Sequence, residues 1–183
     1  MSLIKNIITV MCCMTFLMTP EAADAGYLFH ATKGGFASKI AKSGFKTTRM
    51  NPRARFGKQI YFSNSAKAAF KEKPNADTLI RFRKSRLFSK RMFDTTRMSE
   101  NRLRRISGLR DMNGTIKRKR GVIGPKLAHK IGDYSRKNRL IVKYRSARYK
   151  PGINYGLSPS LYRTYPRIVR PVGDPVPRAQ IYR

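Results

Sequence analysis

The 183-residue chain has no tryptophan, only two cysteines, only two histidines and only nine acidic residues. Both cysteines, Cys12 and Cys13, lie in the first 25 residues, so the rest of the chain offers neither a disulfide nor a thiolate nucleophile. The histidines, His30 and His129, are far apart and the acidic residues are scattered, which argues against a metal-ligand cluster. The nucleotide-binding patterns GxxxxGK[ST] and GxGxxG are also absent.

The first 25 residues have the composition of an export signal. Lys5 gives a positive start, IITVMCCMTFLM is a 12-residue apolar run, and Ala23 and Ala25 form a small-residue pattern typical of signal peptidase cleavage. A bilayer-spanning helix needs about 20 residues. We therefore predict a signal peptide over residues 1–25, cleavage before Gly26, and a secreted or periplasmic protein without a transmembrane segment. An uncleaved anchor is the alternative.

Positive charge is what the sequence has in excess. The chain contains 41 Lys and Arg against nine Asp and Glu, a net charge of +32. Removing residues 1–25 leaves 40 basic and seven acidic residues, or about +33. Such a charge costs stability by self-repulsion and attracts polyanions, whereas ordinary soluble domains carry single-digit charges. We predict a polyanionic partner, which could be nucleic acid, an acidic neutralising or delivery protein, or an anionic membrane surface.

Apolar periodicity predicts one α+β domain with a sheet core over residues 26–150. The expected strands are 26–32, 58–64, 77–88 and 138–149, and the expected helices are 34–43, 65–73 and 99–110. After Lys150 the chain contains six of its ten prolines and four of its nine tyrosines without a regular period. This composition predicts an extended C-terminal tail over 151–183 that wraps the domain or orders on a partner. Its interleaved Arg and Tyr residues are also typical of single-strand binders.

Residues 27–70 contain the ordered segments FHAT, IAKSGF and FGKQIYFSNSAKAAF. They resemble the ADP-ribosyltransferases of the diphtheria-toxin and poly(ADP-ribose) polymerase class. That family has a strand His-x-Thr/Ser, a helix ending in GF or GI, and a strand G-K-G-x-Y-F followed by a helix of small residues. The resemblance implies a split β-sandwich of two small sheets with flanking short helices, and NAD as substrate.

The resemblance also implies roles for individual residues. His30 would donate a hydrogen bond to a ribose hydroxyl, the backbone of Ala31 would hold the carboxamide, and Tyr61 would stack on the nicotinamide ring. The full set of expected NAD-binding residues is His30, Ala31, Thr32, Tyr61, Ser63, Ser65 and Phe70.

The third catalytic residue of the family, an acid on a later strand, has no clear counterpart. The last expected strand offers Asn138 and Arg139 at that place. Rifampicin-modifying relatives use an Asp some 35 residues after the Tyr, and Asp94 resembles it. The expected catalytic residues are therefore His30, Tyr61 and Asp94, with Glu100 and Asp133 as alternatives to the aspartate. The departure from the family pattern argues against processive chain building and leaves an inactive relative as an alternative.

The leading hypothesis is an exported, monomeric mono-ADP-ribosyltransferase, a bacterial toxin or effector that acts in a target-cell cytosol after delivery. Its acceptor would be a macromolecule, either nucleic acid or a protein bound to nucleic acid. One alternative is a non-enzymatic secreted cationic protein that binds nucleic acid or anionic polymers. Another is a secreted ribonuclease with His30 or His129 as general base, which requires two catalytic groups within reach of one another.

Overall fold

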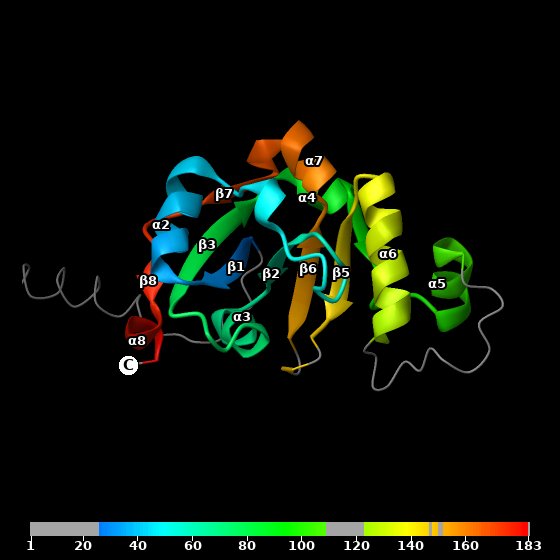
Figure 1. The fold of residues 1–183 in the computed structure, drawn as a ribbon, viewed down its shortest axis with the longest axis horizontal. Helices are drawn as coiled ribbons and strands as arrows, with labels where there is room; N and C mark the ends of the chain where they lie inside the picture. The colour runs from blue at the N-terminus through cyan, green and yellow to red at the C-terminus, as the bar shows by residue number, and fades with distance from the viewer. Residues whose placement is uncertain (1–25, 109–122, 147, 150–151, 183) are drawn as a thin grey trace, which may run out of the picture.

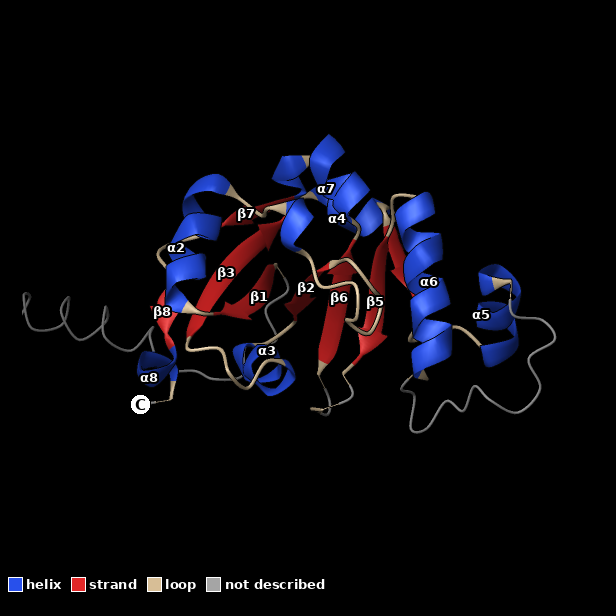
Figure 2. Ribbon diagram, viewed as in Figure 1, coloured by secondary structure: helices blue, strands red, loops and turns tan. Residues whose placement is uncertain are grey.

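The computed structural model describes residues 26–108, 123–146, 148–149 and 152–182, without the side chains of Arg49, Glu100 and Ser107. The predicted signal peptide lies outside these residues. The described chain is α+β, as predicted, and is built on one open, mixed sheet of eight strands. Figure 2 shows the sheet running across the molecule, with helices on several sides of it.

The elements follow one another without long gaps in the described ranges. The strands are β1 (Tyr27–Thr32), β2 (Ile60–Ser63), β3 (Thr78–Lys84), β4 (Met92–Asp94), β5 (Ile141–Arg145), β6 (Ile153–Leu157), β7 (Val169–Pro171) and β8 (Val176–Pro177). The helices are α2 (Gly34–Ser43), α3 (Ala66–Glu72), α4 (Arg86–Lys90), α5 (Glu100–Ser107), α6 (Pro125–Lys137), α7 (Pro159–Thr164) and α8 (Arg178–Ile181), with 3-10 turns η2 (Thr47–Arg49) and η3 (Pro166–Ile168).

The sheet has a narrow junction in its middle. Its strand order is β4-β5-β6-β2-β1-β3-β7, with β8 also paired to β3, and only β4 and β5 run parallel (Figure 1). Strands β1 and β2 share a single residue pair, Phe29 with Ser63, while the other neighbouring strands share two to six pairs. The sheet therefore consists of two half-sheets, β4-β5-β6-β2 and β1-β3-β7 with β8 also on β3, joined by one residue pair.

Local sequence explains the two helices that follow β1 and β2. Gly44 ends α2 with a positive φ of 76°, and its N–H donates to the carbonyl of Ile40. Ser65 caps α3 by accepting a hydrogen bond from the Ala68 N–H, a contact worth about 1 kcal/mol. Both boundaries agree with those predicted from the sequence.

Three apolar clusters pack the helices on the sheet. The largest contains Leu28, Ile60, Phe62, Ile80, Phe82, Ala37 of α2 and Leu161 of α7. The second places Leu127 and Ile131 of α6 against Val142 and Tyr144 of β5. The third, which is smaller, places α3 on Ala31 and Leu79. Because side chains alternate along a strand, the first cluster lies on one face of the sheet and the other two lie on the opposite face.

The prediction of an extended C-terminal tail is wrong for residues 152–182. They form β6, α7, η3, β7, β8 and α8, and β6 lies between β5 and β2 in the sheet. The boundary predicted at residue 150 therefore falls inside the domain. Strand β6 shows no apolar alternation because it is buried on both faces, with Tyr155 and Leu157 in the first cluster and buried Asn154 on the other side.

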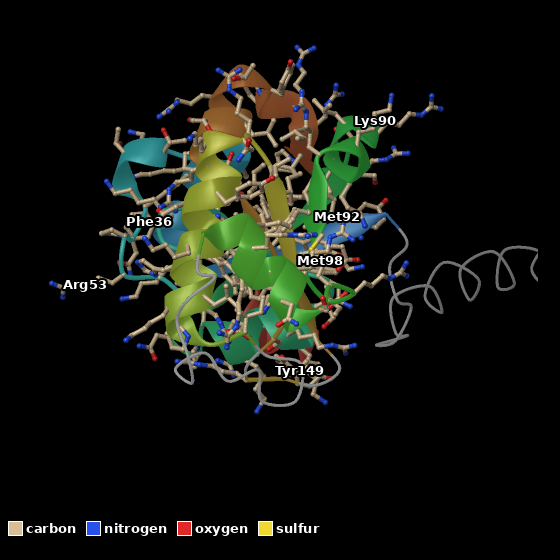
Figure 3. All side chains as sticks on the ribbon, turned by 90° about the vertical axis from the view of Figure 1, so that its right-hand side faces the viewer. Phe36, Arg53, Lys90, Met92, Met98 and Tyr149 are labelled. Carbon is tan, nitrogen blue, oxygen red and sulfur yellow. The ribbon has the colours of Figure 1, made fainter. Side chains whose placement is uncertain are left out.

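Two further elements differ from the sequence prediction. The strand expected to reach Phe88 ends at Lys84, because α4 begins at Arg86 and buries Phe88. Helix α6, which begins with Pro125 in the first turn, was not predicted. None of the described helices is long and apolar enough to cross a membrane. Figure 3 shows basic side chains projecting on all sides of the view, Arg53 and Lys90 among them.

Candidate functional site

His30 of β1 is tied to the backbone of β2. Its Nδ1 lies 2.7 Å from the Tyr61 carbonyl oxygen. A carbonyl can only accept, so Nδ1 carries the proton and donates, and Nε2 is left as an acceptor. The ring packs edge-on against Phe45 and Phe62, with centroids 5.1 and 6.0 Å away. Burial lowers the pKa of His30 to about 4, against the opposing effect of the Tyr61 carbonyl, so the imidazole is neutral at pH 7. In this tautomer Nε2 cannot donate the hydrogen bond that the sequence analysis expected.

The hydroxyl of Tyr61 holds the loop before β2. It accepts a hydrogen bond from the Phe56 N–H at 3.1 Å and donates one to the Gly57 carbonyl at 2.8 Å. Gly57 has a φ of 70°, which favours glycine at this turn. Burial raises the pKa of the Tyr61 phenol to about 12, so it stays protonated. Tyr61 is therefore a neutral, half-buried aromatic residue under the 51–58 loop.

The side chains of His30 and Tyr61 point to opposite faces of the sheet. His30 contacts Phe62, whose neighbours are in the first cluster, while Tyr61 packs against the second. Period-two alternation along β2 requires this, since Phe62 directly follows Tyr61. The structure therefore joins the His30 ring to the Tyr61 backbone at the junction of the half-sheets, but it does not bring the two side chains into contact.

A carboxylate that the sequence analysis did not single out lies on the Tyr61 side. Glu72, at the end of α3, accepts a hydrogen bond from Asn154 Nδ2 at 3.0 Å and another from the Ser146 hydroxyl. Ser63 Oγ donates to Asn154 Oδ1 at 2.5 Å. This network links α3 to β2, β6 and the end of β5, and it orients the Glu72 carboxylate.

Arg55 and Tyr144 complete the group around Tyr61. Burial lowers the pKa of Arg55, with the opposing effects of nearby Tyr144, Glu72 and Tyr61. Its guanidinium also donates to the Ile123 carbonyl. Burial raises the pKa of Tyr144 well above its ordinary value, and Tyr61 and Glu72 add to that effect. We call Arg55, Tyr61, Glu72 and Tyr144 the Tyr61 cluster.

Gln59 has a buried amide without a partner. It is 4% exposed, and neither Nε2 nor Oε1 makes a hydrogen bond within the described residues. The amide lies against Gly156, where any Cβ would collide with it. Gly156 pairs with Tyr61, so the amide is on the Tyr61 face of β2. An unpaired buried amide costs about 1–3 kcal/mol. The amide therefore leaves one donor group and one acceptor atom without a partner among the described residues.

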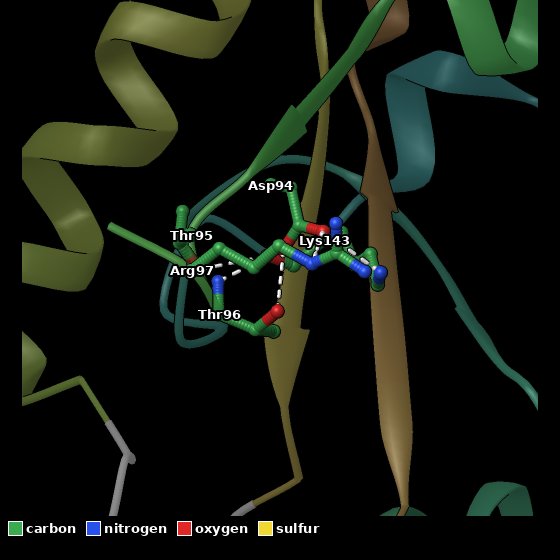
Figure 4. A network of polar contacts seen from close by, with 5 residues as sticks. All are labelled: Asp94, Thr95, Thr96, Arg97 and Lys143. Carbon is green, nitrogen blue, oxygen red and sulfur yellow. Dashed lines mark hydrogen bonds and ion pairs between the residues drawn. The ribbon is translucent and has the colours of Figure 1, made fainter.

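Asp94, the predicted third catalytic residue, lies elsewhere (Figure 4). It ends β4 and accepts hydrogen bonds from Lys143 Nζ at 2.8 Å and Thr96 Oγ1 at 2.6 Å. Burial raises the pKa of its carboxyl, but these hydrogen bonds outweigh burial and hold the pKa below its ordinary value. Strand register pairs Asp94 with Lys143, Lys143 with Tyr155, and Tyr155 with Phe62, so Asp94 lies on the same face of the sheet as His30. Strand β4 is four strands away from β1, however, which separates the two strands by about 19 Å.

The remaining expected NAD-binding residues have structural partners. Ala31 and Thr32 are buried in β1 beside β3, and Ser65 caps α3. Phe70 is buried in α3, with its ring 6.0 Å from that of Tyr182 and Arg178 above it, so it does not face Tyr61. Only Ser63 joins the network that contains Glu72.

The other candidate acids and the second histidine are not in the Tyr61 cluster. Asp133 pairs with Arg136 on α6, and His129 is exposed on the same helix. The side chain of Glu100, in the first turn of α5, lies outside the described part. In the described ranges the hydrogen bond and ring contacts of His30 are with Tyr61, Phe45 and Phe62, and no three His, Cys, Asp or Glu side chains could hold a metal ion together.

The structure also has a shallow, open hollow away from these residues. It is lined by Pro74, Asn75, Ala76, Asp77, Pro177, Arg178, Ala179 and Tyr182, and it contains none of the predicted site residues. No family model, curated protein or solved structure matches this chain.

Proposed function

We propose that this chain is a mono-ADP-ribosyltransferase that cleaves NAD and transfers ADP-ribose to a macromolecular acceptor. In that reaction the bond between nicotinamide and ribose C1 breaks, its electron pair leaves with nicotinamide, and the acceptor nucleophile bonds to C1 as it gives up a proton. The protein must therefore hold the ring, orient the ribose and accept a proton.

The hydrogen bond between His30 Nδ1 and the Tyr61 carbonyl is the observation that carries the proposal. It couples the two residues on which the resemblance depends, although 31 residues separate them. Burial keeps His30 neutral, and the hydrogen bond puts the proton on Nδ1, so Nε2 can accept a hydrogen bond from a hydroxyl group.

We also propose that the two half-sheets correspond to the two small sheets of a split β-sandwich. The single pair between β1 and β2 supports this assignment, because backbone pairing is weakest where His30 and Tyr61 approach each other. A ligand lying across that junction could contact both faces, which neither half-sheet alone would permit.

Glu72 is our candidate for the missing acid. Asn154 and Ser146 fix its carboxylate. Arg55 lies close enough to Glu72 and to Tyr61 for both to affect its pKa. A carboxylate in this position could accept a hydrogen bond from a ribose hydroxyl or a proton from the acceptor. Gln59, on the same face, would hold the carboxamide.

The test is NAD consumption and transfer of labelled ADP-ribose to cell lysate by the purified protein. His30→Asn keeps a donor for the Tyr61 carbonyl and removes Nε2, so we expect a fall in kcat of at least tenfold with the fold intact. Glu72→Gln keeps both accepted hydrogen bonds on one oxygen and removes the charge, and we expect a similar fall.

Matched carboxylate variants distinguish Glu72 from the other acids. Asp94→Asn and Asp133→Asn remove one negative charge each, and we expect wild-type turnover from both. Loss of activity in Asp94→Asn alone would return the role to Asp94. No NAD turnover by the wild-type protein, tested with RNA-containing and RNase-treated lysates, would contradict the transferase proposal itself.

We propose further that the protein is exported, because residues 1–25 resemble a signal peptide, and that it is a monomeric toxin or effector that acts in a target-cell cytosol after delivery. The net charge of +32 favours a polyanionic partner and supports a second candidate, a non-enzymatic cationic binding protein. The ribonuclease candidate has less support, since His129 is exposed on α6 while the hydrogen bond and ring contacts of His30 are with Tyr61, Phe45 and Phe62.

A further inference from the structure

The half-sheet of β1, β3 and β7 has a cationic and aromatic face. Alternation along β3 buries Ile80 and Phe82 in the first cluster, so Arg81 and Arg83 point to the other side, where both are exposed. The neighbouring positions on that side are Tyr27 and Phe29 of β1, both half-buried, and exposed Arg170 of β7. We call Tyr27, Phe29, Arg81, Arg83 and Arg170 the outer face.

Strand register arranges the outer face in rows. Tyr27, Arg83 and Arg170 are directly paired across three strands, and Phe29 pairs with Arg81 in the next row. Side chains in such pairs have Cβ atoms about 5 Å apart. The guanidinium of Arg81 lies 4.9 Å from the centroid of the Tyr27 ring, so a cation already stacks on an aromatic ring here.

The arginines of the outer face are not neutralised by any ion pair in the part of the chain that the structure describes. Among the described residues, ion pairs are formed at Asp94 and Asp133, and none involves Arg81, Arg83 or Arg170. Like charges paired directly across a sheet, such as Arg83 and Arg170, destabilise it. An external anion that lay between them would remove this repulsion.

The aromatic residues indicate which anion fits. A free phosphate would neutralise the arginines but leave the Tyr27 ring unused, and an acidic peptide offers no flat groups in regular register with its charges. A single-stranded nucleic acid has both, because phosphates contact arginines while bases stack on exposed rings of a sheet. A duplex keeps its bases stacked inside and would reach this face only through phosphates.

Further arginine and aromatic side chains lie beyond the end of the outer face, near β8 and α8. Strand β8 pairs Val176 with Leu79, two residues from Arg81, and leads into α8. There Arg178 lies 5.0 Å from the centroid of the Phe70 ring and 5.8 Å from that of the Tyr182 ring. The seven residues of β3 extend about 23 Å, long enough for several nucleotides.

We propose that the outer face binds single-stranded nucleic acid, with Arg81, Arg83 and Arg170 at backbone phosphates and the Tyr27 ring against a base. The proposal does not depend on NAD chemistry, and its test contains no NAD. It assigns the excess positive charge of the chain a defined surface and a defined ligand.

Fluorescence anisotropy of labelled 15-nucleotide RNA and DNA strands with the purified protein tests this proposal. The double variant Arg83→Gln/Arg170→Gln should weaken binding and reduce the slope of log K against log salt by about 1.4, since each phosphate contact on a single strand contributes about 0.7. The matched control Lys39→Gln/Lys42→Gln removes the same charge from α2, which packs on the opposite face, and should leave the slope unchanged.

Tyr27 variants test stacking separately from charge. Tyr27→Ala should raise the dissociation constant roughly 5- to 150-fold, the range for loss of one stacked base, and Tyr27→Phe should restore affinity. Equal weakening by both double variants would overturn the proposal in favour of diffuse charge attraction. So would duplex binding as tight as single-strand binding with no effect of Tyr27→Ala, or equally effective competition by a polyglutamate of the same charge.

Discussion

Protonation of His30 should lower the stability of the protein in weak acid. The native pKa is about 4, because burial disfavours the imidazolium, whereas an unfolded histidine has the ordinary value of 6.5. The unfolded state therefore binds a proton first as the pH falls, and unfolding becomes more favourable. The stability that comes from keeping His30 neutral is complete above pH 6.5 and is lost as the pH falls from there to about 4.

The size of this effect follows from the two pKa values. Each unit between them is worth about 1.4 kcal/mol, so the full loss is about 3.4 kcal/mol below pH 4 and about 2 kcal/mol at pH 5. The other titrating groups are the same in wild type and His30→Asn, so comparing the two proteins removes their contribution. Lys73 is the charged neighbour that adds to the lowering of the His30 pKa.

The assay is urea unfolding of wild type and His30→Asn between pH 7 and 5 at constant ionic strength, which fixes the screening of the large net charge. We expect the variant to have the lower free energy of unfolding at pH 7, because it loses ring packing on Phe45 and Phe62. The difference in free energy of unfolding between the two proteins should then shrink by about 2 kcal/mol at pH 5. If this difference stays constant within about 0.5 kcal/mol between pH 7 and 5, the assignment of a buried, neutral His30 is refuted.

Three other substitutions test the packing and the polar networks, each by urea unfolding. Gly132→Ala should destabilise by about 1–3 kcal/mol because its Cβ would lie 2.7 Å from the Phe56 carbonyl carbon, whereas Gly35→Ala, with open space around it, should be neutral or slightly stabilising. Glu72→Ala should cost about 1–3 kcal/mol, since buried Asn154 loses an acceptor, and a smaller loss for Glu72→Gln is the expected comparison. Lys143→Met should also destabilise by about 1–3 kcal/mol at pH 7, with the loss disappearing as Asp94 protonates in acid; a pH-independent loss would show that packing alone is responsible.

Much of the first half of the fold could be predicted from local sequence. The strand before His30, the helix ended by Gly44, and the helix capped by Ser65 depend on periodicity and cap residues that lie within a few positions of one another. Helix α6 also had a usable signal, since Pro125 begins it and Leu127, Ala128 and Ile131 recur on one face, but its many charged residues obscured the pattern.

The C-terminal third was harder to predict for a physical reason. Strand β6 is only five residues long, contains Gly156, and is buried on both faces. Its stability comes from pairing with β2 and β5 on either side, so its own residues show neither alternation nor high strand propensity. Proline and tyrosine in this region were typical of a tail, but here they border short elements that close the domain.

Some residues of the candidate site could likewise be identified from local sequence, whereas one depends on distant partners. His30, Gln59 and Tyr61 lie in the segments that resemble an ADP-ribosyltransferase, Arg55 directly precedes the third segment, and sequence order alone places His30 and Tyr61 on successive strands. Glu72 could not be identified in this way, because its partners Ser146 and Asn154 are 74 and 82 residues away.

The charge of the protein, its α+β class, its shortage of metal ligands and thiols, and the local boundaries around His30 and Tyr61 follow from the amino-acid sequence alone. The tertiary fold sets which faces those side chains occupy, which carboxylate joins the Asn154 network, and that Arg83 and Arg170 are paired without an ion pair among the described residues. Composition and caps act over a few residues, whereas strand order and register depend on the burial of the whole sheet, to which distant segments contribute together.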